Sequence, residues 1–155
     1  MLNPIKEIVK WQRDAGNAAK PYDDFLESSF QIEEALEGFD LVLLASQLYP
    51  VDRPEDCTNA KFLSRQIATM AGAQKLQLAD VDRLDKACDA IIFAIGSMTK
   101  LGLDHHAITK ALNIVNDANK AKLGMSRDAE GKLLKPEGFV GPEVKLQELL
   151  DGIRK

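Results

Sequence analysis

The run QIEEALEGFDLVLLASQL, residues 31–48, decides the fold that this sequence predicts. It places three glutamates, Glu33, Glu34 and Glu37, at the head of a strongly apolar segment. At ~100° per residue, Glu37 lies about 40° from Glu33 around a helix, and Glu34 lies about 100° from it. Leu44 falls about 20° from Glu33 if the same helix continues. The three carboxylates are therefore predicted to lie within the apolar stripe, where an unpaired charge is costly, and we expect a cation among them.

The composition predicts one compact domain over residues 1–155, with a core of about 3–124 and a tail of 125–155, because 45% of the residues are hydrophobic. A net charge of −4 argues against an extended nucleic-acid footprint. No stretch approaches the ~18 apolar residues of a membrane span, and the start lacks the apolar region of a signal peptide. Cys57 and Cys88 form neither a metal-finger spacing nor a disulfide framework, so we expect a reduced cytoplasmic protein.

Apolar residues recur at helical spacing along nearly the whole chain, without a convincing alternating strand. The longer helices are predicted at about 3–15, 21–48, 78–101 and 104–124. A shorter helix is expected within 51–75, and a terminal helix is expected from about Pro142. Asn3, followed by Pro4, and Asp104 are helix-start signals. The pattern predicts an all-α fold, a four-helix bundle with a loop-rich tail and a short terminal helix.

A second group of acids begins the run DVDRLDKACDAIIFAIG, residues 80–96. Asp82, Asp85 and Asp89 cluster on a flank roughly 100° from the centre of its apolar face. The stretch 90–96 is apolar on every side, and a helix of that kind is buried. Asp85 and Asp89 are therefore expected to stand where a buried flank begins.

Two helices that each carry acids into a buried surface can hold divalent metal ions between them. Carboxylate oxygens suit hard ions, which predicts Mg²⁺ or Mn²⁺, and the lack of His or Cys at ligand spacing argues against zinc. The alternative is that both groups are surface charges, paired in part with lysines. A transport or storage metal protein is a further alternative, but the sequence lacks the His partners usual in carboxylate di-iron bundles.

The order of these segments resembles the all-α nucleoside triphosphate pyrophosphatases, which include MazG-like proteins, dimeric dUTPases and phosphoribosyl-ATP pyrophosphohydrolase. Glu34 and Glu37 match the family's ExxE pair, and Glu33 matches the acid that often precedes it. In the ExxD pair that follows, Asp89 matches the final aspartate, whereas Lys86 stands where Glu is expected.

Asp85 is the predicted substitute for the acid that Lys86 replaces. It lies about 40° from Asp89 at ~100° per residue. DKACDAIIFAIG also resembles a DALAD-type variant that has aspartates at these two positions. Lys86 itself either points outward or pairs with the carboxylates, and in the second case it would replace a metal ion and silence the site.

Two downstream segments extend the resemblance over most of the chain. VNDANKAKLG resembles the family's VxxSNxSKxG stretch, with Asn119 and Lys122 at its characteristic positions. EGKLLKPEGFVGPE resembles the DGK…K…P tail of some members, with Lys132 and Lys135 matching its lysines. The alternative interpretation of these lysines is a basic helix end and loop exposed to solvent.

Through this resemblance, the chain is expected to hydrolyse a nucleoside triphosphate between the α and β phosphates, giving a nucleoside monophosphate and pyrophosphate. The implied residues are Glu34, Glu37, Asp85 and Asp89 as metal ligands, Glu33 as a further ligand or general base, and Asn119, Lys122, Lys132 and Lys135 as phosphate contacts. Related proteins often build their sites across subunits, which implies a homodimer or homotetramer. The runner-up is a non-catalytic helical module that binds nucleotide or a protein partner, and Lys86 favours it.

Overall fold

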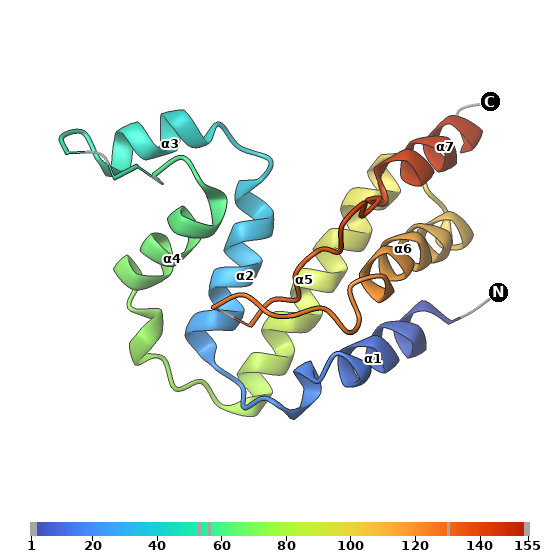
Figure 1. The fold of residues 1–155 in the computed structure, drawn as a ribbon, viewed down its shortest axis with the longest axis horizontal. Coiled ribbons are helices and arrows are strands. Elements are labelled where there is room, and N and C mark those ends of the chain that lie inside the picture. Colours follow the sequence, from blue (N-terminus) through green and yellow to red (C-terminus); the bar gives the residue numbers. More distant parts are fainter. Residues whose placement is uncertain (1–2, 53, 56, 130, 154–155) are drawn as a thin grey trace. The chain divides into compact units, whose positions relative to one another are not determined.

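The computed structural model describes residues 3–52, 54–55, 57–129 and 131–153, and in this part of the chain the protein is all-α, as predicted (Figure 1). The helices are α1 (Pro4–Asp14), α2 (Asp24–Leu36), α3 (Leu41–Leu48), α4 (Ala60–Met70), α5 (Asp80–Lys100), α6 (His105–Lys120) and α7 (Glu143–Ile153). Two short 3₁₀ turns, η1 (Asn17–Ala19) and η2 (Ala73–Lys75), follow α1 and α4. The described residues include one isolated antiparallel bridge, between Arg127 and Leu133.

The chain divides into two compact units. The larger unit comprises residues 1–20 and 85–155, and the smaller unit comprises residues 21–84. The boundary falls inside α5, so the first turn of this helix belongs to the smaller unit. One domain over the whole chain remains a prediction.

Side-chain caps set where the helices begin. The Asn3 side chain accepts hydrogen bonds from the backbone N–H groups of Ile5 and Lys6, with Pro4 at the first helical position. Asp104 accepts from the N–H of Ala107 in the same way at the start of α6. Both predicted helix starts are confirmed, because these caps satisfy N–H groups that have no partner within the helix.

The single helix predicted over 21–48 is wrong, because it is two helices. α2 ends at Leu36, and Gly38 and Phe39 separate it from α3. The Asp40 side chain then accepts the N–H of Leu43 at 3.0 Å and begins a new helix. Glycine is a poor helix former, and a capping aspartate favours a fresh start. Leu44 therefore does not lie on the same helix as Glu33.

The smaller unit is built on close packing of α2 against α4 (Figure 1). Ser29 of α2 and Ser64 of α4 are both fully buried. Their hydroxyls donate to the carbonyls of Phe25 at 2.7 Å and Lys61 at 2.9 Å, each within its own helix. Small side chains whose polar atoms are satisfied locally let two helix backbones approach closely.

An ion pair joins the start of α2 to the first turn of α5, inside the smaller unit. Asp24 is buried, and its carboxylate accepts from the Arg83 guanidinium at 2.7 and 3.3 Å. Arg83 also bonds Asp80 at 2.9 Å and lies 4.7 Å from the centre of the Tyr22 ring. The hydrogen bond to Asp24 raises the pKa of Arg83, so the pair stays charged.

The larger unit has a core of Leu103, Ile108 and Ala111, against which α7 packs through Leu146, Leu149 and Leu150. α1 is held to α6 by two polar contacts. Lys120 donates to Glu7 at 3.0 Å, which raises the pKa of Lys120, and the Trp11 indole donates to the Asn119 carbonyl at 3.0 Å.

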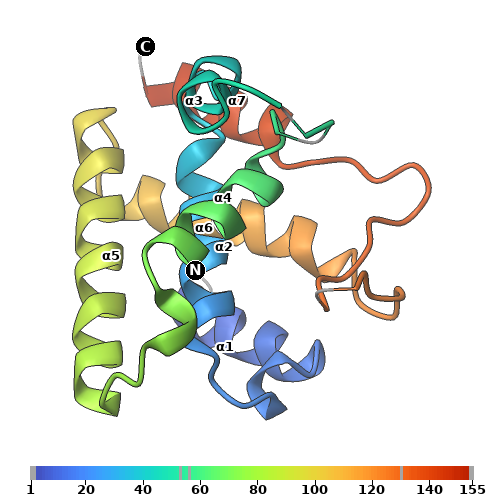
Figure 2. The ribbon, with the colours of Figure 1, turned by 90° about the vertical axis from the view of Figure 1, so that its left-hand side faces the viewer.

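Among its described residues, the segment between α6 and α7 has no helix and forms a long loop from the end of α6 to the start of α7 (Figure 2). Arg127 anchors its first part, because the guanidinium donates to the carbonyls of Ala15 and Gly131. Lys20 donates to the Gly131 carbonyl as well, at 3.2 Å. Gly131 has a φ of +83°, a left-handed conformation that other residues rarely adopt, so this turn favours glycine.

The buried flank predicted for the helix that is now α5 is wrong, since none of its residues is buried. Asp85, Cys88 and Asp89 are all exposed. The apolar side chains of Ile92 and Phe93 are 63% and 74% exposed. Among the helices of the described residues, none is long and apolar enough to cross a membrane.

The Asp104 cap predicts a specific dependence of stability on pH. Its bond to the Ala107 N–H, 2.8 Å long, lowers the pKa of Asp104. A depressed folded-state pKa stabilises the protein above the unfolded pKa, about 3.9 for Asp, and this contribution is lost as the pH falls through the folded value. We expect Asp104→Asn, which keeps an acceptor but does not titrate, to flatten the fall in unfolding free energy below about pH 4. Urea denaturation between pH 7 and pH 2.5 measures this.

The matched control is Glu148→Gln, an exposed residue within α7. Asp104→Ala should lower the urea midpoint at pH 7, because it removes the cap entirely. An acid limb as steep in Asp104→Asn as in the unmodified protein would contradict this assignment.

Candidate functional site

The three glutamates lie at the end of α2 but do not share one environment. Glu33 is buried, with 8% of its surface exposed, whereas Glu34 and Glu37 are exposed. Glu37 is the C-terminal cap residue, and its backbone N–H donates to the Glu33 carbonyl at 3.2 Å. The prediction that all three carboxylates lie within an apolar stripe is therefore wrong for Glu34 and Glu37. The break after α2 explains this, because the apolar residues beyond it belong to another helix.

Arg65 is the cation that the buried glutamate requires. Its guanidinium lies 3.7 Å from the Glu33 carboxylate, reaching across from α4, and only 18% of the Arg65 side chain is exposed. It also lies 5.8 Å from the centre of the Phe30 ring and donates to the Lys61 carbonyl at 3.1 Å. The expected cation is confirmed at Glu33. Sequence reasoning missed that Arg65 supplies it, although a lone arginine among apolar residues of a short helix is the signal.

The predicted metal ligands fall in two units. Glu34 and Glu37 belong to the smaller unit, while Asp85 and Asp89 lie on the part of α5 in the larger unit. Lys86, between the two aspartates, is partly buried. Within either unit, the described residues bring together no group of three or more Asp, Glu, His or Cys side chains that could hold a metal ion. Each unit thus offers a pair of exposed carboxylates one helical turn apart.

Three of the four predicted phosphate contacts meet in the larger unit. Lys122 donates to the Asn119 side chain at 2.9 Å, at the end of α6. The ammonium groups of Lys122 and Lys135 lie 5.3 and 5.6 Å from the centre of the Phe139 ring. We call Asn119, Lys122, Lys135 and Phe139 the Phe139 cluster. Sequence reasoning missed Phe139, for which the only signal was an aromatic residue in a lysine-bearing tail.

Lys132, the fourth predicted contact, is positioned by a tight turn. Its backbone N–H donates to the Asp128 carboxylate at 2.8 Å, and the Asp128 N–H donates to the Lys132 carbonyl at 2.9 Å. The bridge between Arg127 and Leu133 closes the same turn. This turn fixes the backbone of Lys132 on the segment that also carries Lys135.

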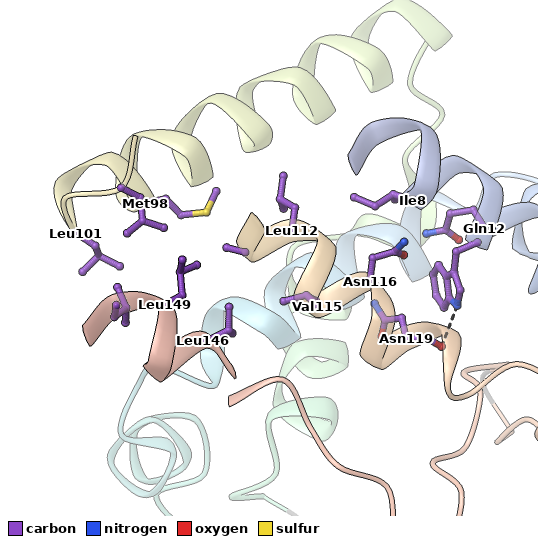
Figure 3. Close-up of a pocket in the computed structure, with 14 residues that line it drawn as sticks. Ile8, Gln12, Met98, Leu101, Leu112, Val115, Asn116, Asn119, Leu146 and Leu149 are labelled. Carbon is purple, nitrogen blue, oxygen red and sulfur yellow. Dashed lines mark hydrogen bonds between the residues drawn. The ribbon is translucent and has the colours of Figure 1, made fainter. Parts of the chain in front are cut away.

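A pocket of about 380 Å³ lies in the larger unit and was not foreseen from the sequence (Figure 3). Most of its wall is apolar, and six of its lining residues are Leu101, Leu103, Leu112, Leu146, Leu149 and Leu150. Gln12 and Asn119 lie at one end of it beside Asn116 (Figure 3). Trp11, whose indole donates to the Asn119 carbonyl, also lines the pocket. Asn116 is 2% exposed, and neither atom of its amide has a hydrogen-bond partner among the residues that the structure describes.

Comparison with family models, with curated proteins and with solved structures gives no match to this chain. The likeness to the pyrophosphatase family therefore rests on the sequence segments quoted above.

Because Glu33 pairs with Arg65, we predict that Glu33 stabilises the folded protein more than the neighbouring Glu34 does. Glu33→Gln leaves a largely buried guanidinium beside a neutral partner, so we expect the unfolding free energy to fall by about 2–3 kcal/mol. Glu34→Gln, the adjacent exposed residue, is the matched control and should stay within about 0.5 kcal/mol of the unmodified protein. Urea denaturation followed by circular dichroism measures both values.

The double variant Glu33→Leu/Arg65→Leu separates pairing from general damage. Replacing both charges by apolar side chains should recover much of the loss, because a buried pair contributes little net stability once its desolvation is counted. A Glu33→Gln protein as stable as Glu34→Gln would show that Arg65 does not depend on this carboxylate.

Proposed function

We propose that the protein is a metal-dependent nucleoside triphosphate pyrophosphohydrolase that cleaves between the α and β phosphates. The observation that carries the proposal is the Phe139 cluster. Lys122 and Lys135, two of the predicted phosphate contacts, lie over one ring although 13 positions separate them, and Lys122 donates to Asn119, a third predicted contact. Basic helix-end and loop residues that were simply solvated would have no reason to converge.

The partners of the lysines in the Phe139 cluster suit an anion site. An aromatic face attracts an ammonium group through its quadrupole and orders its position. The Phe139 ring lies beside two ammonium groups, those of Lys122 and Lys135. Ordered ammonium groups, together with the amide N–H of Asn119, can donate to phosphate oxygens.

The acids of α2 and α5 fit the chemistry of a hard divalent ion. Their donors are all carboxylate oxygens, and those of Glu34, Glu37, Asp85 and Asp89 belong to exposed residues that solvent and substrate can reach. Mg²⁺ or Mn²⁺ held there would neutralise the triphosphate and acidify an attacking water. Glu33 is the proposed further ligand or general base; its pairing with Arg65 would also fix the last turn of α2, from which Glu34 projects.

The proposal includes an arrangement in which α2 faces α5, as in a MazG-like four-helix bundle, within a homodimer or homotetramer. Two pairs of carboxylates on different helices make a metal site only when those helices face one another. The exposed Ile92 and Phe93 of α5 favour association, since large apolar side chains in a contiguous exposed run mark contact surfaces.

A non-catalytic helical module that binds nucleotide or a protein partner is the second candidate. Lys86 favours it, because an ammonium group stands between Asp85 and Asp89 in sequence, where the family expects an acid. A lysine that pairs with these carboxylates would lower their affinity for a metal ion.

A nucleotide panel tests the proposed function directly. Purified protein with Mg²⁺ or Mn²⁺ is expected to release pyrophosphate, and not orthophosphate, from one or a few nucleoside triphosphates. Glu37→Gln and Asp89→Asn should each lower the rate by roughly a hundredfold or more, because each removes a ligand. Glu148→Gln is the control and should leave the rate unchanged.

The same proteins distinguish the two candidates. A working metal site predicts that Mg²⁺ or Mn²⁺ raises the melting temperature, and that Glu37→Gln and Asp89→Asn abolish the rise. Lys86→Glu should strengthen both metal binding and turnover. Folded protein with neither pyrophosphate release nor a metal-dependent melting shift would favour the binding module.

The Phe139 cluster predicts a separate effect on substrate affinity. Lys122→Met and Lys135→Met should each raise KM roughly tenfold, with a smaller change in kcat, because each removes a charge from bound phosphate. Lys145→Met, on the exposed face of α7, is the matched control. Steady-state kinetics at two salt concentrations measures the effect, and an unchanged KM in both cluster variants would remove these lysines from the site.

A further inference from the structure

We propose that the pocket lined by α1, α5, α6 and α7 binds a neutral, mostly apolar small molecule that carries a primary or cyclic amide, and that Asn116 recognises this amide. The pocket lies wholly within the larger unit, and its volume of about 380 Å³ falls in the range of small-molecule sites. The proposal does not rest on nucleotide hydrolysis.

The Asn116 side chain is the observation that points to a ligand. It is 2% exposed, yet neither its amide nitrogen nor its amide oxygen has a hydrogen-bond partner among the described residues. It extends from α6 towards Gln12 of α1, at the polar end of the pocket (Figure 3). Buried polar groups are almost always hydrogen-bonded, so an unpartnered amide on a pocket wall marks where a bound molecule would supply the bonds.

The neighbours of Asn116 are already engaged elsewhere. The Gln12 side chain accepts from Asn17 at 2.8 Å, and the Trp11 indole donates to the Asn119 carbonyl at 3.0 Å. Lys122 donates to the Asn119 side chain at 2.9 Å. These bonds occupy the amide oxygens of Gln12 and Asn119 and the indole N–H of Trp11, whereas both the donor and the acceptor of the Asn116 amide are open to a ligand.

The chemistry of the pocket sets the class of ligand. An Asn side chain offers one acceptor and two donors, and its two-point complement is a group with an N–H beside a C=O on the same edge. Primary and cyclic amides have this edge, whereas a carboxylate accepts only. The remaining wall is formed by leucines together with Met98 and Val115, which contact apolar carbon and do not neutralise a charge. A neutral molecule with an apolar body therefore fits.

Trp11 provides the readout, because it is the only tryptophan of the chain and it lines the pocket. Octanamide, ε-caprolactam and thymidine are titrated while indole fluorescence is followed. Octanamide and ε-caprolactam represent a free amide, and thymidine represents a cyclic amide carried by a nucleotide base. Octanoate and 1-octanol are the matched probes that lack the two-point edge. We expect saturable binding of at least one of the three amides. Where octanamide binds, it should bind more tightly than octanoate and 1-octanol by roughly tenfold or more.

Two substitutions test the role of Asn116. Asn116→Leu should remove the preference for amides and leave the melting temperature unchanged or higher, since a buried unpartnered amide is replaced by an apolar side chain. If Asn116→Leu does not fold because the leucine does not fit, Asn116→Ser, which keeps only a small polar group, is tested for the same loss of amide preference. Asn113→Leu, one turn earlier on α6 and away from the pocket lining, is the control and should bind like the unmodified protein.

The outcomes are distinct from those of the nucleotide assay. Binding of octanamide or ε-caprolactam that is lost in the Asn116 variants supports a free amide as ligand, and binding of thymidine alone supports a nucleotide base. Binding of none of the three amides overturns the proposal. Equal binding of octanamide and 1-octanol, or unchanged amide binding in both Asn116 variants, also overturns it.

Discussion

The first N–H groups of a helix have no partner within it, and at five helices of this chain side-chain oxygens accept from them. The caps are Asn3, Asp23, Asp40, Asn59 and Asp104, at the starts of α1, α2, α3, α4 and α6. Each cap sets the first residue of its helix and so decides which side chains share a face. Asp40 shows the consequence, because its cap begins α3 and leaves Glu37 at the C-terminal end of α2. The environment of every acid on α2 follows from that position.

Periodicity predicted the all-α fold because it reports which residues share a helix face, and caps with a strong local signature fixed the starts at Asn3 and Asp104. It failed between Glu37 and Asp40, since the apolar pattern of α3 happens to continue in phase with that of α2. The apolar pattern of one helix does not show which other residues cover that helix. A buried flank was therefore predicted for α5, although none of its residues is buried. The Asn119–Lys122 contact joins residues one turn apart, which local spacing in the sequence can indicate. The contact of Phe139 with Lys122 depends on the path of the tail, which local spacing does not indicate.

Carboxylates and aromatic rings both hold cations in this chain, and Arg65 and Arg83 have a partner of each kind. Arg65, Arg83 and Lys120 each form an ion pair with a carboxylate from another helix, so each of these ion pairs joins two helices. Lys122 and Lys135 lie over the face of one aromatic ring. A ring orders an ammonium group through its quadrupole. Lys120 thus joins α1 to α6, whereas Lys122 and Lys135 are both ordered by one residue of the tail, which is the feature that the proposed phosphate contacts require.

Asn116 is an uncharged side chain whose amide is buried without a hydrogen-bond partner among the described residues, and burial of this kind lowers stability. An apolar residue of similar size would fill the same space in α6 without a buried amide to satisfy. Natural sequences depart from the most stable local choice chiefly at functional sites. An amide that destabilises its own helix face, at the polar end of an otherwise apolar pocket, is best explained by a molecule that completes its hydrogen bonds.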